Sequence, residues 1–202
     1  MNSGNGTVAK TSQTSPLRVD FVAGHSLGLT FAPGKKASSL NSPVVWDRDL
    51  EADLERLQGH YAVDCLVTLL EENEFELLRI PALRERVRAH HITSHWFPIP
   101  DGGVPADVGS FIATVRTIVS ALRTGERVVV HCRGGLGRAG TVAACVLVAL
   151  GDDPEDAIRA VREARSEAIE NPEQENFVTE FLQRWSRVAP ATTARGGSCG
   201  RP

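Results

Sequence analysis

One segment, VVVHCRGGLGRAGT at positions 128–141, constrains the fold more than any other part of the chain. Its valines predict a buried strand, and the apolar residues that follow, up to Leu150, predict a buried helix. The turn between them contains Cys132, several glycines and Arg138. A glycine-rich turn from a strand into a helix N-terminus often binds an anion in α/β proteins, so the segment predicts both a fold class and a kind of site.

The same segment contains GLGRAG at positions 135–140, which fits the dinucleotide-binding pattern G-x-G-x-x-G. That pattern belongs to a β-α-β unit, in which an acidic residue at the end of the next strand binds the ribose. Here Gly-Asp-Asp-Pro and two predicted helices follow Leu150, and no further strand is expected. A Walker loop is also excluded, because no Lys-Ser or Lys-Thr follows the glycines.

The residue types of this turn favour a site that binds phosphate next to a nucleophile. The backbone N–H groups of a glycine-rich loop can point inward and bind an anion, and the helix dipole adds positive potential. Arg138 can hold two oxygens of a phosphate, and the same positive surroundings would favour the thiolate of Cys132. Taken singly, each residue also fits a tight turn with a buried cysteine and a surface arginine.

The rest of the chain alternates between predicted strands and predicted helices. Strands are expected at 17–22, as an edge strand, and at 27–31, 62–70, 92–97 and 127–130. Helices are expected from a cap at Asp47, over 74–90 with a break at Pro81, over 107–124, over 139–150, from a cap at Asp153, and from a cap at Asn171 to residue 188. This order predicts an α/β fold with a central mixed, mostly parallel sheet flanked by helices, and the glycine-rich loop between a central strand and a helix.

Composition limits the organisation and the partners. Polar, serine- and threonine-rich stretches predict disordered tails at 1–16 and 189–202, which leaves 17–188 as one domain. The net charge of -3 gives no positive field for nucleic acid, and the longest apolar run is too short to cross a bilayer. The N-terminus carries no apolar signal-peptide segment. We expect a cytoplasmic monomer with no nucleic-acid or membrane partner.

Cysteine and histidine spacing argues against metal sites and disulfides. The four cysteines are widely spaced and form no C-x-x-C pair, which predicts free thiols in a reducing compartment. His90, His91 and His95 lie near one another, but no matching set of carboxylates or cysteines accompanies them. We therefore expect no metal.

Four parts of the chain together resemble one enzyme family. His131-Cys132, five residues and then Arg138 resemble the signature loop of the cysteine-dependent protein tyrosine and dual-specificity phosphatases. HWFPIPDGGVP (95–105) resembles the general-acid loop of the kinase-associated phosphatase type. LGLTFAPGKK (27–36) resembles the N-terminal segment of that group, and AIENPEQENF (168–177) its C-terminal one. The similarity covers about residues 17–188.

The resemblance implies a protein phosphatase that hydrolyses the phosphate monoesters of a phosphoprotein through a cysteinyl-phosphate intermediate, without a metal or cofactor. It implies that Cys132 is the nucleophile, that Asp101 is first the acid and then the base, and that His131 orders the loop backbone. The implied phosphate-binding residues are Arg133, Gly134, Gly135, Leu136, Gly137 and Arg138.

Two positions depart from the family pattern. Many relatives have Ser or Thr after the loop arginine, and this chain has Ala139, so breakdown of the intermediate is expected to be slow unless Thr141 compensates. Where the tyrosine phosphatases have the two glutamines of Gln-Thr-x-x-Gln, this chain has Glu170 and Gln174. Gln174 could position water, or it could complete a capping box with Asn171.

Three questions stay open at this stage. With Ala139 as its support, the chain could be a phosphate-binding module without turnover. A phosphoinositide phosphatase would need more basic residues around the loop than Arg133 alone. Lys35 and Lys36 either border the cleft or form a charged turn.

Overall fold

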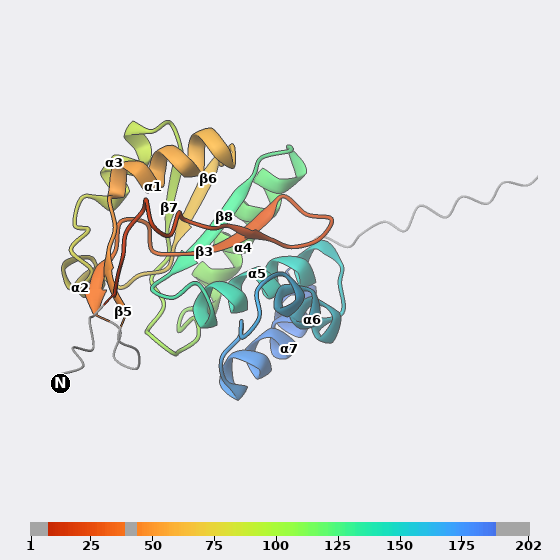
Figure 1. The fold of residues 1–202 in the computed structure, drawn as a ribbon. Coiled ribbons are helices and arrows are strands. Elements are labelled where there is room, and N and C mark those ends of the chain that lie inside the picture. The colour runs from red at the N-terminus through yellow and green to blue at the C-terminus, as the bar shows by residue number, and fades with distance from the viewer. Residues whose placement is uncertain (1–7, 39–43, 189–202) are drawn as a thin grey trace, which may run out of the picture.

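The computed structural model describes residues 8–38 and 44–188. Its centre is a five-stranded sheet in the order β2-β3-β8-β6-β7 (Figure 1). Four of these strands are parallel, and β2 runs antiparallel to β3 at one edge. The predicted central mixed, mostly parallel sheet is therefore confirmed. The strands are β2 (Asp20–Phe21), β3 (Leu27–Phe31), β8 (Val128–Cys132), β6 (Cys65–Thr68) and β7 (Thr93–Trp96).

Helices cover both faces of this sheet, and β8 shows how the sequence achieves it. Side chains alternate between the faces of a strand. Val128 and Val130 accordingly join the core formed with α4 (Val108–Arg123), α5 (Gly137–Leu150), α6 (Pro154–Ala164) and α7 (Pro172–Ser186). Val129 joins the core on the other face, with α1 (Leu50–Glu55), the π-helical turn η1 (Arg56–His60), α2 (Glu72–Leu77) and α3 (Leu83–Ala89).

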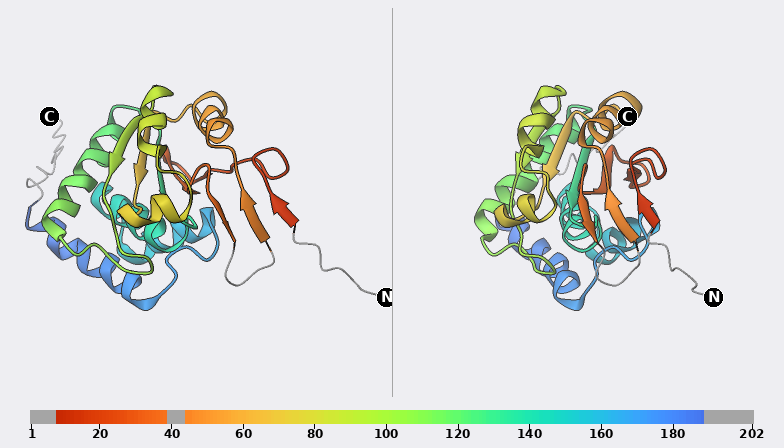
Figure 2. Two further views of the ribbon diagram at one scale, coloured as in Figure 1. Left: turned by 90° about the vertical axis from the view of Figure 1, so that its left-hand side faces the viewer. Right: turned by 60° about the vertical axis from the view of Figure 1, so that its left-hand side comes forward.

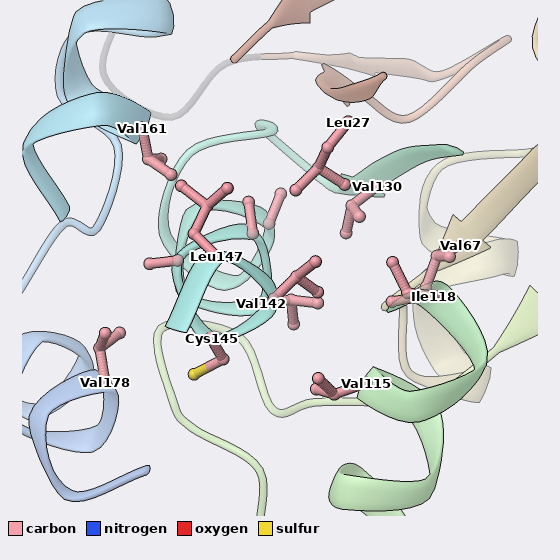
Figure 3. Packing of buried hydrophobic residues seen from close by; sticks show 14 of the residues in the cluster. Leu27, Val67, Val115, Ile118, Val130, Val142, Cys145, Leu147, Val161 and Val178 are labelled. Atoms are coloured by element: carbon pink, nitrogen blue, oxygen red, sulfur yellow. The ribbon is translucent and has the colours of Figure 1, made fainter. Parts of the chain in front are cut away.

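The helix after the glycine-rich loop is the centre of the larger core. Almost every side chain of α5 is buried, because the helix is apolar all round. Figure 3 shows Val142, Cys145 and Leu147 of this helix surrounded by side chains from the sheet and from three other helices: Leu27, Val67, Val115, Ile118, Val130, Val161 and Val178. This packing fixes the N-terminal end of α5 relative to β8.

A second, three-stranded sheet was not predicted. It consists of β1 (Val8–Lys10), β5 (Val44–Asp47) and β4 (Lys36–Ser38), in the order β1-β5-β4, and it lies to one side of the molecule in Figure 2. The expected disordered tail is therefore wrong for residues 8–16. β1 pairs with β5, and Arg48 donates a hydrogen bond to the carbonyl of Ser15, which composition alone does not reveal. The other expected tail, 189–202, lies outside the described residues.

Most predicted elements are present with shifted ends. The expected cap at Asp47 is wrong, because Asp47 ends β5 and Asp49 accepts the N–H of Ala52 at the start of α1. The expected strands 17–22, 62–70 and 92–97 shrink to the cores of β2, β6 and β7, while β8 extends two residues further, to Cys132. The break at Pro81 and the caps Asp107, Asp153 and Asn171 are confirmed.

Candidate active site

Cys132 lies at the C-terminal end of β8, where the chain turns toward α5. The residue is 3% exposed, and its Sγ accepts a hydrogen bond from the N–H of Gly135 at 3.2 Å. A backbone donor and the nearby start of a helix both favour negative charge on sulfur. The position therefore suits a thiolate.

Two glycines are required by close contacts within this loop. Gly135 has a φ of +75°, and a Cβ there would lie 2.3 Å from the carbonyl oxygen of Thr30. A Cβ on Gly137 would lie 2.2 Å from Oε2 of Glu170. No side chain caps α5 at Leu136, so the first N–H groups of this helix are suited to binding an anion.

Arg138 is buried in the first turn of α5 and is held by a carboxylate that sequence reasoning missed. Its two Nη atoms donate to both carboxylate oxygens of Glu74 in α2, at 2.6 and 2.9 Å, and Nη1 also donates to the carbonyl of Ile99 at 3.0 Å. Burial opposes the charge of Glu74, but the hydrogen bonds from Arg138 and from the N–H of Glu71, together with the charges of Arg138 and Arg133, outweigh it, and the pKa of Glu74 lies below its usual value. The guanidinium is therefore fixed in orientation before any ligand binds.

Asp101 reaches the same guanidinium from the loop after β7. Its Oδ1 lies 2.7 Å from Nη2 of Arg138, and its side chain is 58% exposed. The N–H of Asp101 donates to Glu71 at 3.3 Å, and Gly102 next to it has a φ of +72°. The structure thus places Asp101, which the family resemblance singled out, beside Arg138 on an exposed turn.

The other loop residues surround this cluster. Nη1 of Arg133 lies 3.9 Å from Oδ2 of Asp101. The carbonyl of Gly134 accepts a hydrogen bond from Arg165, and that of Leu136 accepts one from the N–H of Ile169 at 3.4 Å. Because these carbonyl groups accept hydrogen bonds from residues outside the loop, the surrounding protein holds the loop in place.

His131 supports the loop from the middle of the sheet. Burial lowers the pKa of His131 to about 4, so its ring is neutral at physiological pH. The carbonyl of Cys132, 3.3 Å from Nδ1, can only accept, so Nδ1 carries the proton and Nε2 accepts the hydroxyl of Thr68 at 2.8 Å. His131 thereby fixes the backbone beside the nucleophile, which agrees with its predicted supporting role.

Gln174 connects the segment before α7 to the acid loop. Asn171 accepts the N–H of Gln174 as expected, but the side chain of Gln174 accepts from Glu170 rather than from Asn171. Its amide nitrogen lies 3.4 and 3.3 Å from the carbonyl oxygens of Gly102 and Gly103. The reciprocal capping box is therefore wrong, and Gln174 holds the acid loop instead. Asn171 does the same, since its Nδ2 donates to Gly102 at 2.8 Å.

Thr141 does not replace the hydroxyl that Ala139 lacks. Its Oγ1 donates to the carbonyl of Gly137 within α5 at 2.9 Å and is buried there. Ala139 is completely buried in the core. The compensation expected from Thr141 is therefore not supported.

The two adjacent lysines have different surroundings. Lys36 is exposed at the start of β4, and its Nζ lies 3.6 Å from Oδ1 of Asp47 in β5. Lys35 is 7% exposed, and its Nζ donates to the carbonyl of Arg133 at 3.3 Å. Lys35 therefore lies under the signature loop.

The described cysteines differ sharply in their surroundings. Burial raises the pKa of Cys65 to about 11 and that of Cys145 well above its usual value. All three described cysteines are free. Within residues 8–38 and 44–188, no group of three or more His, Cys, Asp and Glu side chains is placed to hold a metal ion. In the same residues, no helix is long and apolar enough to cross a membrane.

A thiol at the end of a central parallel strand, a glycine-rich loop entering a helix, and an oriented arginine with a nearby carboxylic acid define a class. They are the arrangement of the cysteine-dependent protein phosphatases.

Comparison with known proteins identifies the family. Residues 7–158 match the family model described as cyclin-dependent kinase inhibitor 3. The rat protein cyclin-dependent kinase inhibitor 3 is 35% identical over 161 residues, which is 78% of this chain and 72% of the rat protein. The chain therefore belongs to the cyclin-dependent kinase inhibitor 3 family.

Solved structures place the fold in the same class. Kinase associated phosphatase, crystallised with its catalytic-site cysteine substituted by serine, superposes with a TM-score of 0.75 and 28% identity, covering 85% of this chain and 97% of that one. The active form of Tk-PTP gives a TM-score of 0.65 and 26% identity, covering 82% and 97%. The chain is a protein phosphatase of the tyrosine and dual-specificity class.

Proposed function

We propose that this phosphatase acts by two successive displacements at Cys132. The thiolate attacks phosphorus and forms an S–P bond, while the P–O bond to the substrate breaks and the leaving oxygen takes a proton from Asp101. Water then attacks the phosphocysteine, Asp101 takes a proton from that water, and inorganic phosphate leaves. The contact of Arg138 with both Glu74 and Asp101, beside Cys132, carries this proposal.

The phosphoryl group would be bound by the loop from Arg133 to Arg138. Gly135 already donates its N–H to sulfur, and Arg138 is held so that its Nη2 contacts Asp101. A phosphate dianion would compete with the Asp101 carboxylate for that guanidinium.

The substrate is proposed to be a phosphoprotein. The relatives are named for a cyclin-dependent kinase and for association with a kinase, so a phosphorylated kinase is the first substrate to try. We also propose that the chain acts as a monomer and that it works in the cytoplasm. The three cysteines within the described residues are free, which supports a reducing compartment.

A rapid-mixing time course with p-nitrophenyl phosphate near pH 6 tests the proposal, with Cys132→Ser as the control. We expect release of nitrophenol over many turnovers, abolished by the substitution. Because Thr141 does not replace the missing hydroxyl at Ala139, we expect a fast burst followed by a slower steady rate. A burst that stops after one turnover would mean a phosphate-binding protein with failed hydrolysis. Release that persists in Cys132→Ser would refute Cys132 as the nucleophile.

A further inference from the structure

Lys35 is a buried lysine in the turn that follows β3. Its ammonium group lies 4.6 Å from the ring centre of Phe31 and 4.2 Å from that of Trp46. Its Nζ donates to the carbonyl of Arg133, which also accepts the N–H of Ala32 at 3.4 Å. The side chain is therefore held between two aromatic rings and the outer side of the signature loop.

Among the described residues, Lys35 has no carboxylate as an ion-pair partner, unlike the arginines around it. The neighbouring arginines each have one: Arg48 pairs with Asp53, Arg165 with Asp20, and Arg133 with Asp101. Among the residues that the structure describes, no carboxylate oxygen lies within 4 Å of Nζ of Lys35. The carbonyl that this ammonium contacts belongs to Arg133, the residue that directly follows Cys132.

Burial without a carboxylate partner is costly for a lysine. It lowers the pKa of Lys35 from 10.5 to about 8; the charge of Cys132 opposes this shift, and the three arginines add to it. Charged groups that are buried in this way are concentrated at functional sites of proteins. The charged groups around Lys35 are Arg48, Arg133 and Arg165, each with the carboxylate that pairs with it, Asp53, Asp101 and Asp20 respectively. The groups beside Cys132 are His131 and Arg138, and Arg138 pairs with Glu74.

We propose that Lys35 is a positioning residue of the active site, which stabilises the Cys132 thiolate by its charge and holds the signature loop through the carbonyl of Arg133. This inference rests on the proposed function, since it takes Cys132 as the nucleophile. The loop arginine supplies positive charge on the side of the substrate, and Lys35 supplies it from the side of the protein.

The test measures the thiolate directly, without turnover. The rate of alkylation of Cys132 by iodoacetamide is followed from pH 4 to pH 9, with the modified peptide identified by mass spectrometry. In Lys35→Met we expect the midpoint of the rate against pH to rise by about one unit, since an opposite charge nearby favours the ionised form by that order. At pH values below both midpoints, kcat/KM for p-nitrophenyl phosphate should fall about 10-fold, and the difference should close as the pH rises.

The neighbouring lysine supplies the matched control. Lys36→Met removes the same charge from an exposed side chain and should leave the midpoint where it is in the unsubstituted protein. Lys35→Arg keeps the charge and should restore the midpoint, which a purely structural role would not predict. Lys35→Gln, which keeps a hydrogen-bond donor, replaces Lys35→Met if the latter does not give the native circular dichroism spectrum.

The outcomes separate this inference from the proposed function. If the unsubstituted protein reacts at low pH and Lys35→Met has the same midpoint, Lys35 does not stabilise the thiolate, while the nucleophile stands. If Cys132 of the unsubstituted protein reacts only at the pH of an ordinary thiol, both fail. If the midpoint rises equally in Lys35→Met and Lys36→Met, the cause is a general effect of net charge, and this result would also overturn the inference.

Discussion

At the scale of single residues, the most consequential contact is the buried pair of Arg138 and Glu74. Both oxygens of Glu74 accept from the two Nη atoms, so the plane of the guanidinium is fixed. Breaking one side of a buried ion pair is far more disruptive than losing an exposed one. Glu74 therefore controls the orientation of the proposed phosphate-binding arginine without contacting the phosphate.

Glu74→Gln tests this role. The amide keeps the size of the side chain but loses the charge that holds Arg138, so we expect kcat/KM for p-nitrophenyl phosphate to fall by about 100-fold. Competitive inhibition by inorganic phosphate, which reports binding at Arg138 without a chemical step, should weaken in parallel. Glu76→Gln, on the exposed side of the same short helix, should behave like the unsubstituted protein. Equal losses in both variants would contradict the assignment.

At the scale of elements, the start of α7 holds the acid loop in place. Asn171 both caps this helix, by accepting the N–H of Gln174, and donates to the carbonyl of Gly102 next to Asp101. Gln174 reaches Gly102 and Gly103 from the next turn. The loop that carries the proposed general acid must be placed accurately, and these two side chains hold it from the side of α7.

Asn171→Ser separates the two roles of this residue. Serine still caps a helix, but it lacks the amide that reaches Gly102, so the stability of the fold should change little. We expect kcat to fall about 10-fold with phenyl phosphate, whose leaving group needs an acid, and by less with p-nitrophenyl phosphate, whose leaving group does not. The comparison of the two substrates under saturating conditions is the measurement. An equal loss with both substrates would count against a role in placing Asp101.

Whether a contact could be predicted from the sequence depends on how many residues separate its two members along the chain. Cys132, the loop glycines and Arg138 are contiguous, and the alternation of valines in β8 fixes which face each side chain takes, so this part was predictable. Glu74 lies 64 residues before Arg138, and Lys35 lies 98 residues before Arg133. Contacts of that range depend on which strands become neighbours. A topological signal was present for Glu74, because α2 follows the C-terminal end of β6, next to β8.

At the scale of the whole molecule, a neutral histidine lies at the centre of the main sheet. The pKa of His131 is lowered by burial from 6.5 to about 4. The unfolded chain takes up a proton near pH 6.5, and the folded chain does not do so until about pH 4. Stability is therefore complete above pH 6.5 and is lost as the pH falls from 6.5 toward 4.

Urea unfolding at pH 7 and pH 5 measures this loss. We expect the free energy of unfolding to fall by about 2 kcal/mol between the two, before most carboxylates titrate. His131→Asn, whose amide can still donate to the carbonyl of Cys132, should show a much smaller fall. His91→Asn changes an exposed position with a φ of +59° that asparagine tolerates, and its free energy of unfolding should fall as much as that of the unsubstituted protein. An unchanged pH dependence in His131→Asn would show that other groups cause the loss.

The most direct measurement of the central claim is a rapid quench of the protein during turnover of an aryl phosphate with labelled phosphorus, followed by peptide mapping. The account predicts label on the peptide that contains Cys132 at early times. With p-nitrophenyl phosphate, whose leaving group does not need the acid, it predicts more label, for longer, in Asp101→Asn, because the base for the second displacement is missing. Turnover with no label on Cys132, or with label on another residue, would contradict the account.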